Sequence, residues 1–189
     1  MRRCWSRDRG AAAVETAFLV TFVLVPLVVG AVEFGFGFNE WLSVKAATRE
    51  GARVGASAGD LVSGPGVPKD ADCLSLEATA GALQAVPGDA VVEVWIFESD
   101  TSGSVGNRNR FRPSVDTDDP GALFCGTWVQ IENGWPIASR VNTGVNRDYL
   151  GLRVRFDHSW VTGLPPFGSM VQWREDTVMR VEPAPGFGP

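Results

Sequence analysis

The chain has 189 residues, of which 44% are apolar, enough for one folded domain with its own core and a separate membrane anchor. Its formal net charge is −5, but residues 1–10 carry +3 (four arginines against Asp8), which leaves −8 for the rest. A short basic end followed by an acidic chain argues against a nucleic acid as partner.

The first predicted element is a long apolar helix that begins near Gly10 and reaches Phe38. From Thr16 to Val32 no residue is charged, and these 17 residues correspond to about 26 Å of helix, the short end of a membrane span. An extension to Phe38 makes spanning comfortable if Glu15 and Glu33 lie near opposite membrane interfaces.

The flanking residues of this span predict its orientation. The arginines in front of it keep the N-terminus in the cytoplasm, so the chain after Asn39 is expected outside. Pro26 lies in the middle of the span and predicts a kink.

The span has two plainer interpretations, a cleaved secretory signal peptide and an ordinary signal anchor. A signal peptide has an apolar core of about 7–15 residues followed by a small-x-small cleavage site. Here the core is longer, and the sequence GAVE at residues 30–33 is a poor site. The span alone does not exclude a signal anchor.

Beyond the span the helix is predicted to continue, with Trp41 as an aromatic anchor at the outer interface. Small and apolar residues then recur at spacings of three and four: Val44, Ala47, Gly51, Val54 and Ala58. Gly51 and Gly55 form a small-xxx-small pair that permits close approach of another backbone. Most of this stripe is expected to pack against the helix's own domain.

Three motifs in the first 58 residues carry a resemblance to a known family. They are GAAAVE at residues 10–15, VEFG at 32–35 and AATREGAR at 46–53. Through them the chain resembles the TadE-like family, pilin-like proteins (pseudopilins) of the tight-adherence, Flp-type pilus system. The first motif is similar to a type IV prepilin cleavage site, although Thr16 stands where phenylalanine commonly follows the glutamate.

The resemblance implies roles for individual residues and for partners. A prepilin peptidase would cleave between Gly10 and Ala11, and Glu15 would pair with the new N-terminal amine of a neighbouring subunit. Such pairing would give a reason for a carboxylate in an apolar helix, where an unpaired charge is costly. From the residues alone, Glu15 could simply mark the cytoplasmic interface. Further partners would be other pilin-like subunits and the pilus secretion machinery.

The outer part of the chain is predicted to begin with a second helix. Residues 59–69 are rich in glycine and proline and end the long helix. Asp70 or Asp72 can cap a helix that runs through Val86, with Leu76, Ala80 and Leu83 on its apolar face. Residues 90–98 (AVVEVWIFE) follow as a well-buried strand.

A long loop is predicted over residues 99–121. Its arginines (Arg108, Arg110, Arg112) could form a subunit contact and its aspartates (Asp116, Asp118, Asp119) a calcium site. The aspartates lack the glycine and the final glutamate of an EF-hand loop, so a solvated loop that neutralises its own charges is preferred.

Three further strands are predicted, at residues 127–133, 150–160 and 171–181. In the second of these strands, inward positions alternate with solvent-facing ones; the inward residues are Leu150, Leu152, Val154, Phe156, His158 and Trp160. The third strand repeats the pattern with Glu175 as an interruption; its inward residues are Trp173, Thr177, Met179 and Val181. The last two strands flank residues 162–169 and should form an antiparallel pair. Residues 183–189 are expected to be disordered.

The two downstream cysteines and the single histidine are the remaining candidates for a chemical role. Cys73 and Cys125 could form a disulfide in an oxidising compartment or remain two unrelated buried thiols. His158, the only histidine, lies on the apolar face of its strand and is expected to be a hydrogen-bonded core or edge residue rather than a metal ligand or catalytic group. No cofactor, metal or catalytic motif is predicted.

The predicted fold class is α+β: a long N-terminal transmembrane helix that continues into an extracytoplasmic pilin-like domain with a second helix and an antiparallel sheet of about four strands. The predicted organisation is a basic leader at 1–10, the transmembrane helix at 11–38, the outer domain at 39–182 and the tail at 183–189. The predicted function is a non-enzymatic minor pilin or assembly factor of a Flp-type pilus, located in the cell membrane or incorporated from there into the surface pilus. The alternative is a single-pass, membrane-anchored binding or adhesin domain.

Overall fold

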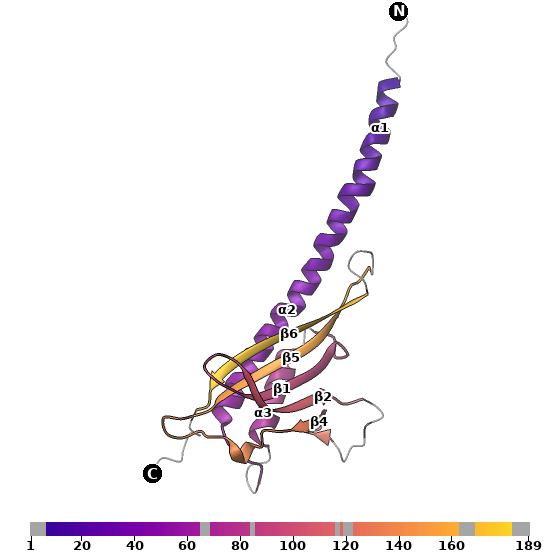
Figure 1. The fold of residues 1–189 in the computed structure, drawn as a ribbon. Coiled ribbons are helices and arrows are strands. Elements are labelled where there is room, and N and C mark those ends of the chain that lie inside the picture. Colours follow the sequence, from indigo (N-terminus) through magenta and orange to yellow (C-terminus); the bar gives the residue numbers. More distant parts are fainter. Residues whose placement is uncertain are drawn as a thin grey trace, which may run out of the picture.

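The computed structural model describes residues 7–64, 69–83, 86–115, 118, 123–162 and 169–182. A long N-terminal helix projects from a six-stranded antiparallel sheet, and a short second helix lies beside the lower half of the long one (Figure 1). The predicted α+β class is therefore confirmed. We call the six strands, the short helix and the part of the long helix from Val44 onward the sheet domain.

The long helix consists of two α-helical parts, α1 (Arg7–Leu19) and α2 (Val25–Ala58), joined by a π-helical turn, η1 (Val20–Leu24). In that turn the backbone N–H of Val25 donates to the carbonyl of Val20, five residues earlier. The wide turn precedes Pro26, which has no N–H to give to an α-helical hydrogen bond. Instead of a sharp kink, Figure 1 shows a gradual bend.

The second helix, α3 (Ala71–Ala82), begins as predicted and ends earlier than predicted. Asp70 caps it by accepting a hydrogen bond from the backbone N–H of Cys73 at 2.8 Å. The helix stops at Ala82, not at Val86. Leu76 and Leu83 are buried as predicted, but Ala80 is exposed. The rest of the buried face includes polar residues and consists of Ala71, Asp72, Cys73, Ser75 and Thr79.

The sheet has the strand order β3-β4-β2-β1-β5-β6. In chain order the strands are β1 (Val91–Ser99), β2 (Val105–Pro113), β3 (Leu123–Phe124), β4 (Trp128–Asn133), β5 (Tyr149–Ser159) and β6 (Met170–Arg180), with a short 3-10 helix, η3 (Ile137–Ser139), before β5. All pairings are antiparallel.

The prediction of about four strands was too low, since only β1, β4, β5 and β6 were anticipated. β2 lies within the segment predicted as a loop, and the two-residue β3 was also missed. β2 has the sequence VGNRNRFRP, in which only Asn109 and Phe111 are buried, so it lacks the apolar alternation of an ordinary strand. It is stabilised by pairing with β1 on one side and β4 on the other.

The core lies between the sheet and the two helices. Along β5, the predicted inward residues Leu150, Leu152, Val154, Phe156 and His158 are all buried, and Trp160 is half-buried. The predicted helical stripe holds for Val44, Ala47 and Gly51. It then turns, so that Ala52, Gly55 and Ala56 are buried while Val54 and Ala58 are only half-buried.

Candidate functional site

The N-terminal half of the long helix is apolar and uncovered. Every residue from Gly10 to Val28 is exposed, and the helix of which they form part is long and apolar enough to cross a membrane. The predicted cleavage and pairing residues, Gly10, Ala11 and Glu15, all lie in α1, which projects away from the sheet domain (Figure 1). The spacing of four residues puts Ala11 and Glu15 one turn apart on the same helix face.

Further along the helix, Glu33 is tied to the sheet. Its carboxylate accepts hydrogen bonds from the backbone N–H groups of Val161 at 2.9 Å and Thr162 at 2.5 Å, directly after β5. The residue is 1% exposed. Glu33 was expected near the outer membrane interface; the structure shows that its carboxylate is satisfied by backbone donors at the end of β5.

Two helical turns after Glu33, Glu40 makes a similar contact, in this case with a side chain of β5. The Nδ1 atom of His158 lies 2.8 Å from Glu40 Oε2, and the imidazole stacks on the Trp173 ring with centroids 5.0 Å apart. Gly37 makes room for this contact, because a Cβ there would lie 2.9 Å from Trp173 Cη2 and 3.1 Å from His158 Nε2. His158 is thus the hydrogen-bonded core residue that its position on the strand predicts.

A third pair completes what we call the helix–hairpin junction, the contact of α2 residues 33–41 with β5, β6 and residues 160–162. The indole N–H of Trp41 donates to Glu175 Oε2 at 3.2 Å. This bond explains why an acidic residue interrupts the inward pattern of β6. Beside it, a groove of about 510 Å³ is lined by Phe34, Phe38, Trp41 and Trp173, among others.

The junction was not predicted, although the sequence carries a signal for it. Glu33 and Glu40 are seven residues apart on one helix face and extend the buried stripe that continues through Val44. Their partners could not be assigned, because the contacts join residues 118 to 134 positions apart in the chain.

The glycine pair further along α2 lies at the contact with α3. Ser75 Oγ donates to the carbonyl of Gly51 at 2.9 Å. A Cβ on Gly51 would lie 2.0 Å from Thr79 Oγ1, and one on Gly55 would lie 3.0 Å from Ser75 Oγ. The close approach that this spacing permits is therefore made within the chain, to its own second helix.

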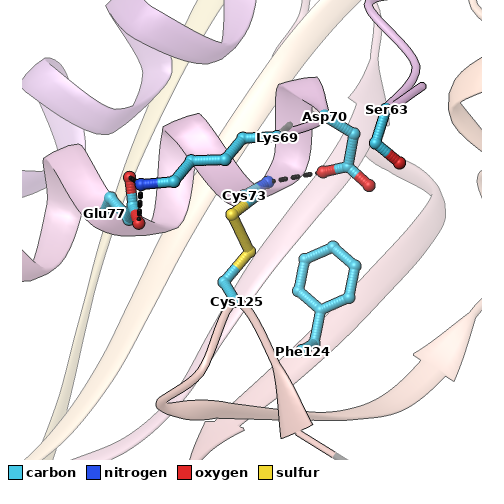
Figure 2. Close-up of a pocket in the computed structure, with 7 residues that line it drawn as sticks. All are labelled: Ser63, Lys69, Asp70, Cys73, Glu77, Phe124 and Cys125. Carbon is cyan, nitrogen blue, oxygen red and sulfur yellow. Dashed lines mark hydrogen bonds and ion pairs between the residues drawn. A yellow bond between two sulfur atoms is a disulfide. The ribbon is translucent and has the colours of Figure 1, made fainter. Parts of the chain in front are cut away.

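The structure joins Cys73 and Cys125 by a disulfide between the start of α3 and the turn that connects β3 with β4 (Figure 2). A hollow of about 310 Å³ lies beside it. Figure 2 shows Lys69 reaching along α3 to Glu77, with Nζ 2.5 Å from Oε1, and Asp70 turned back to cap the helix. Of the charged groups around this hollow, Lys69 and Glu77 thus pair with each other, and Asp70 bonds the backbone of α3.

The three arginines predicted in a loop lie instead on β2, facing away from the helices. Arg110 bonds Glu93 at 2.7 Å and Glu132 at 3.3 Å, and Arg112 bonds Asp118 at 2.6 Å. The Arg112 guanidinium lowers the pKa of Asp118. The charges of Arg110 and Arg112 are thus compensated by acidic residues of the same chain. Asp116 and Asp119, the other residues of the proposed calcium site, lie outside the described residues.

A buried polar network joins α3, β2 and the segment before β5. Asp72 Oδ1 accepts from Arg140 Nη2 at 2.6 Å, and Asp72 Oδ2 accepts from Asn109 Nδ2 at 2.8 Å. The Arg140 guanidinium stacks on Trp135, 4.3 Å from the ring centroid, and its side chain is fully buried. This network fixes the far end of the sheet domain, away from the junction.

Comparison with known proteins connects the N-terminal segment to one family. The model of the TadE-like protein family matches residues 10–53. The match includes Gly10, Ala11, Glu15, Gly51 and the α2 part of the junction, and it confirms the resemblance seen in the three motifs. No curated protein and no solved structure matches the chain.

Proposed function

With residues 10–53 matching the TadE-like family, we propose that this chain is a minor pilin-like subunit (pseudopilin) or assembly factor of a Flp-type, tight-adherence pilus, without enzymatic activity. The observation that carries the proposal is the coincidence of that match with an exposed, apolar helix that ends in a firmly attached sheet domain. In this proposal the helix anchors the chain in the cell membrane and the sheet domain lies outside the cytoplasm.

The proposed mechanism uses the exposed half of the helix. Cleavage after Gly10 by a prepilin peptidase would free the amine of Ala11. Glu15 would then pair with the amine of a neighbouring subunit, so that two charges that are costly in a bilayer are stable only when subunits are in register. The uncovered apolar surface between Gly10 and Val28 would store the subunit in lipid before assembly.

The sheet domain contributes a rigid body. Glu33, Glu40 and Trp41 hold the β5–β6 hairpin against α2, so the domain is attached to the helix just beyond its exposed apolar half. A subunit of this kind would transmit the position of its helix in a bundle directly to its outer surface.

Deleting the chain from its native cells tests the pilus role. We expect surface pili to be lost and to return when the wild-type chain is supplied. Normal pili without the chain would instead favour the alternative, a membrane-anchored binding domain that acts apart from a filament.

The mass of the chain purified from its native membrane tests the processing step. We expect the mass of a chain that begins at Ala11, and a Gly10→Val variant should keep residues 1–10. The matched control is Gly30→Val, at a second glycine of the helix around which there is open space. A wild-type chain that still begins at Met1, in cells with an active prepilin peptidase, would overturn the cleavage step.

A further inference from the structure

The β5–β6 hairpin reaches the depth at which the membrane ends. The hydrocarbon core of a bilayer is about 30 Å thick, or about 20 residues of helix. Counted from Glu15, that length ends near Gly35. The backbone N–H groups of Val161 and Thr162 lie 2.9 and 2.5 Å from the carboxylate of Glu33, two residues before that point. The end of β5 therefore lies level with the outer boundary of the span.

The side chains at this end suit a lipid surface. Val161 is 74% exposed and Met170, at the start of β6, is 57% exposed. Trp160 packs edge-on against Phe34 of the helix, with ring centroids 5.7 Å apart. Aromatic side chains concentrate at the membrane–water interface, where an apolar body and a polar edge are both accommodated.

The charge pattern points the same way. The sequence contains no aspartate, glutamate, lysine or arginine between Asp157 and Arg174. The carboxylate that faces this end of the hairpin, Glu33, is 1% exposed and bonded to two backbone donors. The exposed surface formed by Val161, Thr162, Ser169 and Met170 thus has no charged side chain of its own to desolvate on contact with lipid.

We propose that this end of the hairpin is a second membrane contact, in which Trp160, Val161 and Met170 enter the outer lipid interface beside the helix. Glu33 is the positioning residue, because it holds the backbone of residues 161 and 162 at that depth. A lipid surface is favoured over a protein partner because the depth is set by the helix itself and the contact continues the apolar span without a break. The inference rests on the membrane anchoring in the proposed function.

A fluorescent label that reports on lipid tests the contact. In a Cys4→Ser background with the native disulfide intact, Val161→Cys carries an NBD label, and the full chain is reconstituted into phosphatidylcholine–phosphatidylglycerol vesicles. The matched control is Val145→Cys, an 86% exposed valine in the segment before β5, at the opposite end of that strand. We expect lipids with a nitroxide near the headgroup to quench the label at residue 161 and not the label at residue 145.

The remaining outcomes separate the two proposals. Adding Glu33→Ala should reduce the quenching at residue 161 while the chain stays in the vesicles after alkaline extraction. A vesicle-bound chain whose label at residue 161 is no more quenched than that at residue 145 overturns the membrane contact alone. A blue-shifted label that lipid nitroxides do not quench indicates protein contact and also overturns it. A chain released by alkaline extraction overturns the anchoring, and the contact with it.

Discussion

Glu33 Oε1 lies 2.5 Å from the backbone nitrogen of Thr162, a hydrogen bond between residues 129 positions apart. It joins the helix that leaves the sheet domain to the hairpin that lies along it. The first prediction concerns this bond. Glu33→Ala should accelerate hydrogen exchange at the amides of Val161 and Thr162 by about tenfold or more, the effect of losing a hydrogen bond of ordinary net strength.

The control for this exchange measurement is Glu50→Ala, which removes an exposed carboxylate from the same helix, where it pairs with Arg53. It should leave both amides unchanged. Equal exchange at residues 161 and 162 in wild type and Glu33→Ala would show that the hairpin is held by other contacts.

The second prediction concerns the contact of α2 with α3. In Gly51→Ala the new Cβ would lie 2.0 Å from Thr79 Oγ1 and 2.8 Å from Leu152 Cδ1. Overpacking of this kind should lower the free energy of unfolding by about 1–3 kcal/mol. Thermal unfolding of the full chain in detergent, followed by the near-ultraviolet signal of its tryptophans, measures the change.

Gly35→Ala is the matched control, because the same helix offers open space around that position. Alanine is the better helix former, so this variant should be neutral or slightly more stable. If both variants unfold at the same temperature, the close packing at Gly51 contributes nothing to stability.

The third prediction concerns the buried pair of Asp72 and Arg140. Asp72→Ala leaves the fully buried guanidinium without its carboxylate and should cost about 3–5 kcal/mol of unfolding free energy. The neighbouring Asp70→Ala, which removes only a helix cap, should cost about 1 kcal/mol. The double variant Asp72→Ala/Arg140→Met should be more stable than Asp72→Ala alone. A double variant that is less stable would contradict the pairing.

The fourth prediction concerns the dependence of stability on pH. Burial acts to raise the pKa of Glu93, but hydrogen bonds from Arg110 and Arg155 outweigh it and hold the pKa below the ordinary value of 4.5. The unfolded chain therefore takes up this proton at a higher pH than the folded chain does. The stabilisation by Glu93 is present above about pH 4.5 and is lost as the pH falls through the lower, folded-state pKa.

Unfolding of wild type and Glu93→Gln in urea, over a series of pH values, measures this contribution. The wild type should be the more stable protein near pH 7, and the difference should shrink as the pH falls below 4.5. A difference that stays constant with pH would mean that the charge of Glu93 does not stabilise the fold.

Much of the fold could be predicted from local pattern. The long apolar helix, its continuation past Trp41 and the alternation along β5 follow from runs and periods of apolar residues. β2 could not be found in this way, because its arginines become strand residues only when Glu93 and Glu132 of the neighbouring strands lie opposite them. A single sequence shows the period of a strand but not its partner.

The candidate site likewise contains residues that are close in the sequence and residues that meet only in the folded chain. Gly10, Ala11 and Glu15 could be proposed as site residues from the sequence because their motif is contiguous, and their roles remain predictions. The helix–hairpin junction could not, since Glu40 and His158 are 118 residues apart and meet only once the sheet is formed. Either residue alone resembles an ordinary surface or core position.

A count of surface pili on cells with a Glu15 variant is the most direct test of the proposed assembly role. Surface pili are counted on native cells whose only copy of the chain carries Glu15→Ala, beside cells that carry Thr16→Ala, the adjacent exposed position. We predict that Glu15→Ala removes the pili while the chain remains at its normal level in the membrane, and that Thr16→Ala leaves them intact. Normal pili on the Glu15→Ala cells would contradict assembly through this carboxylate.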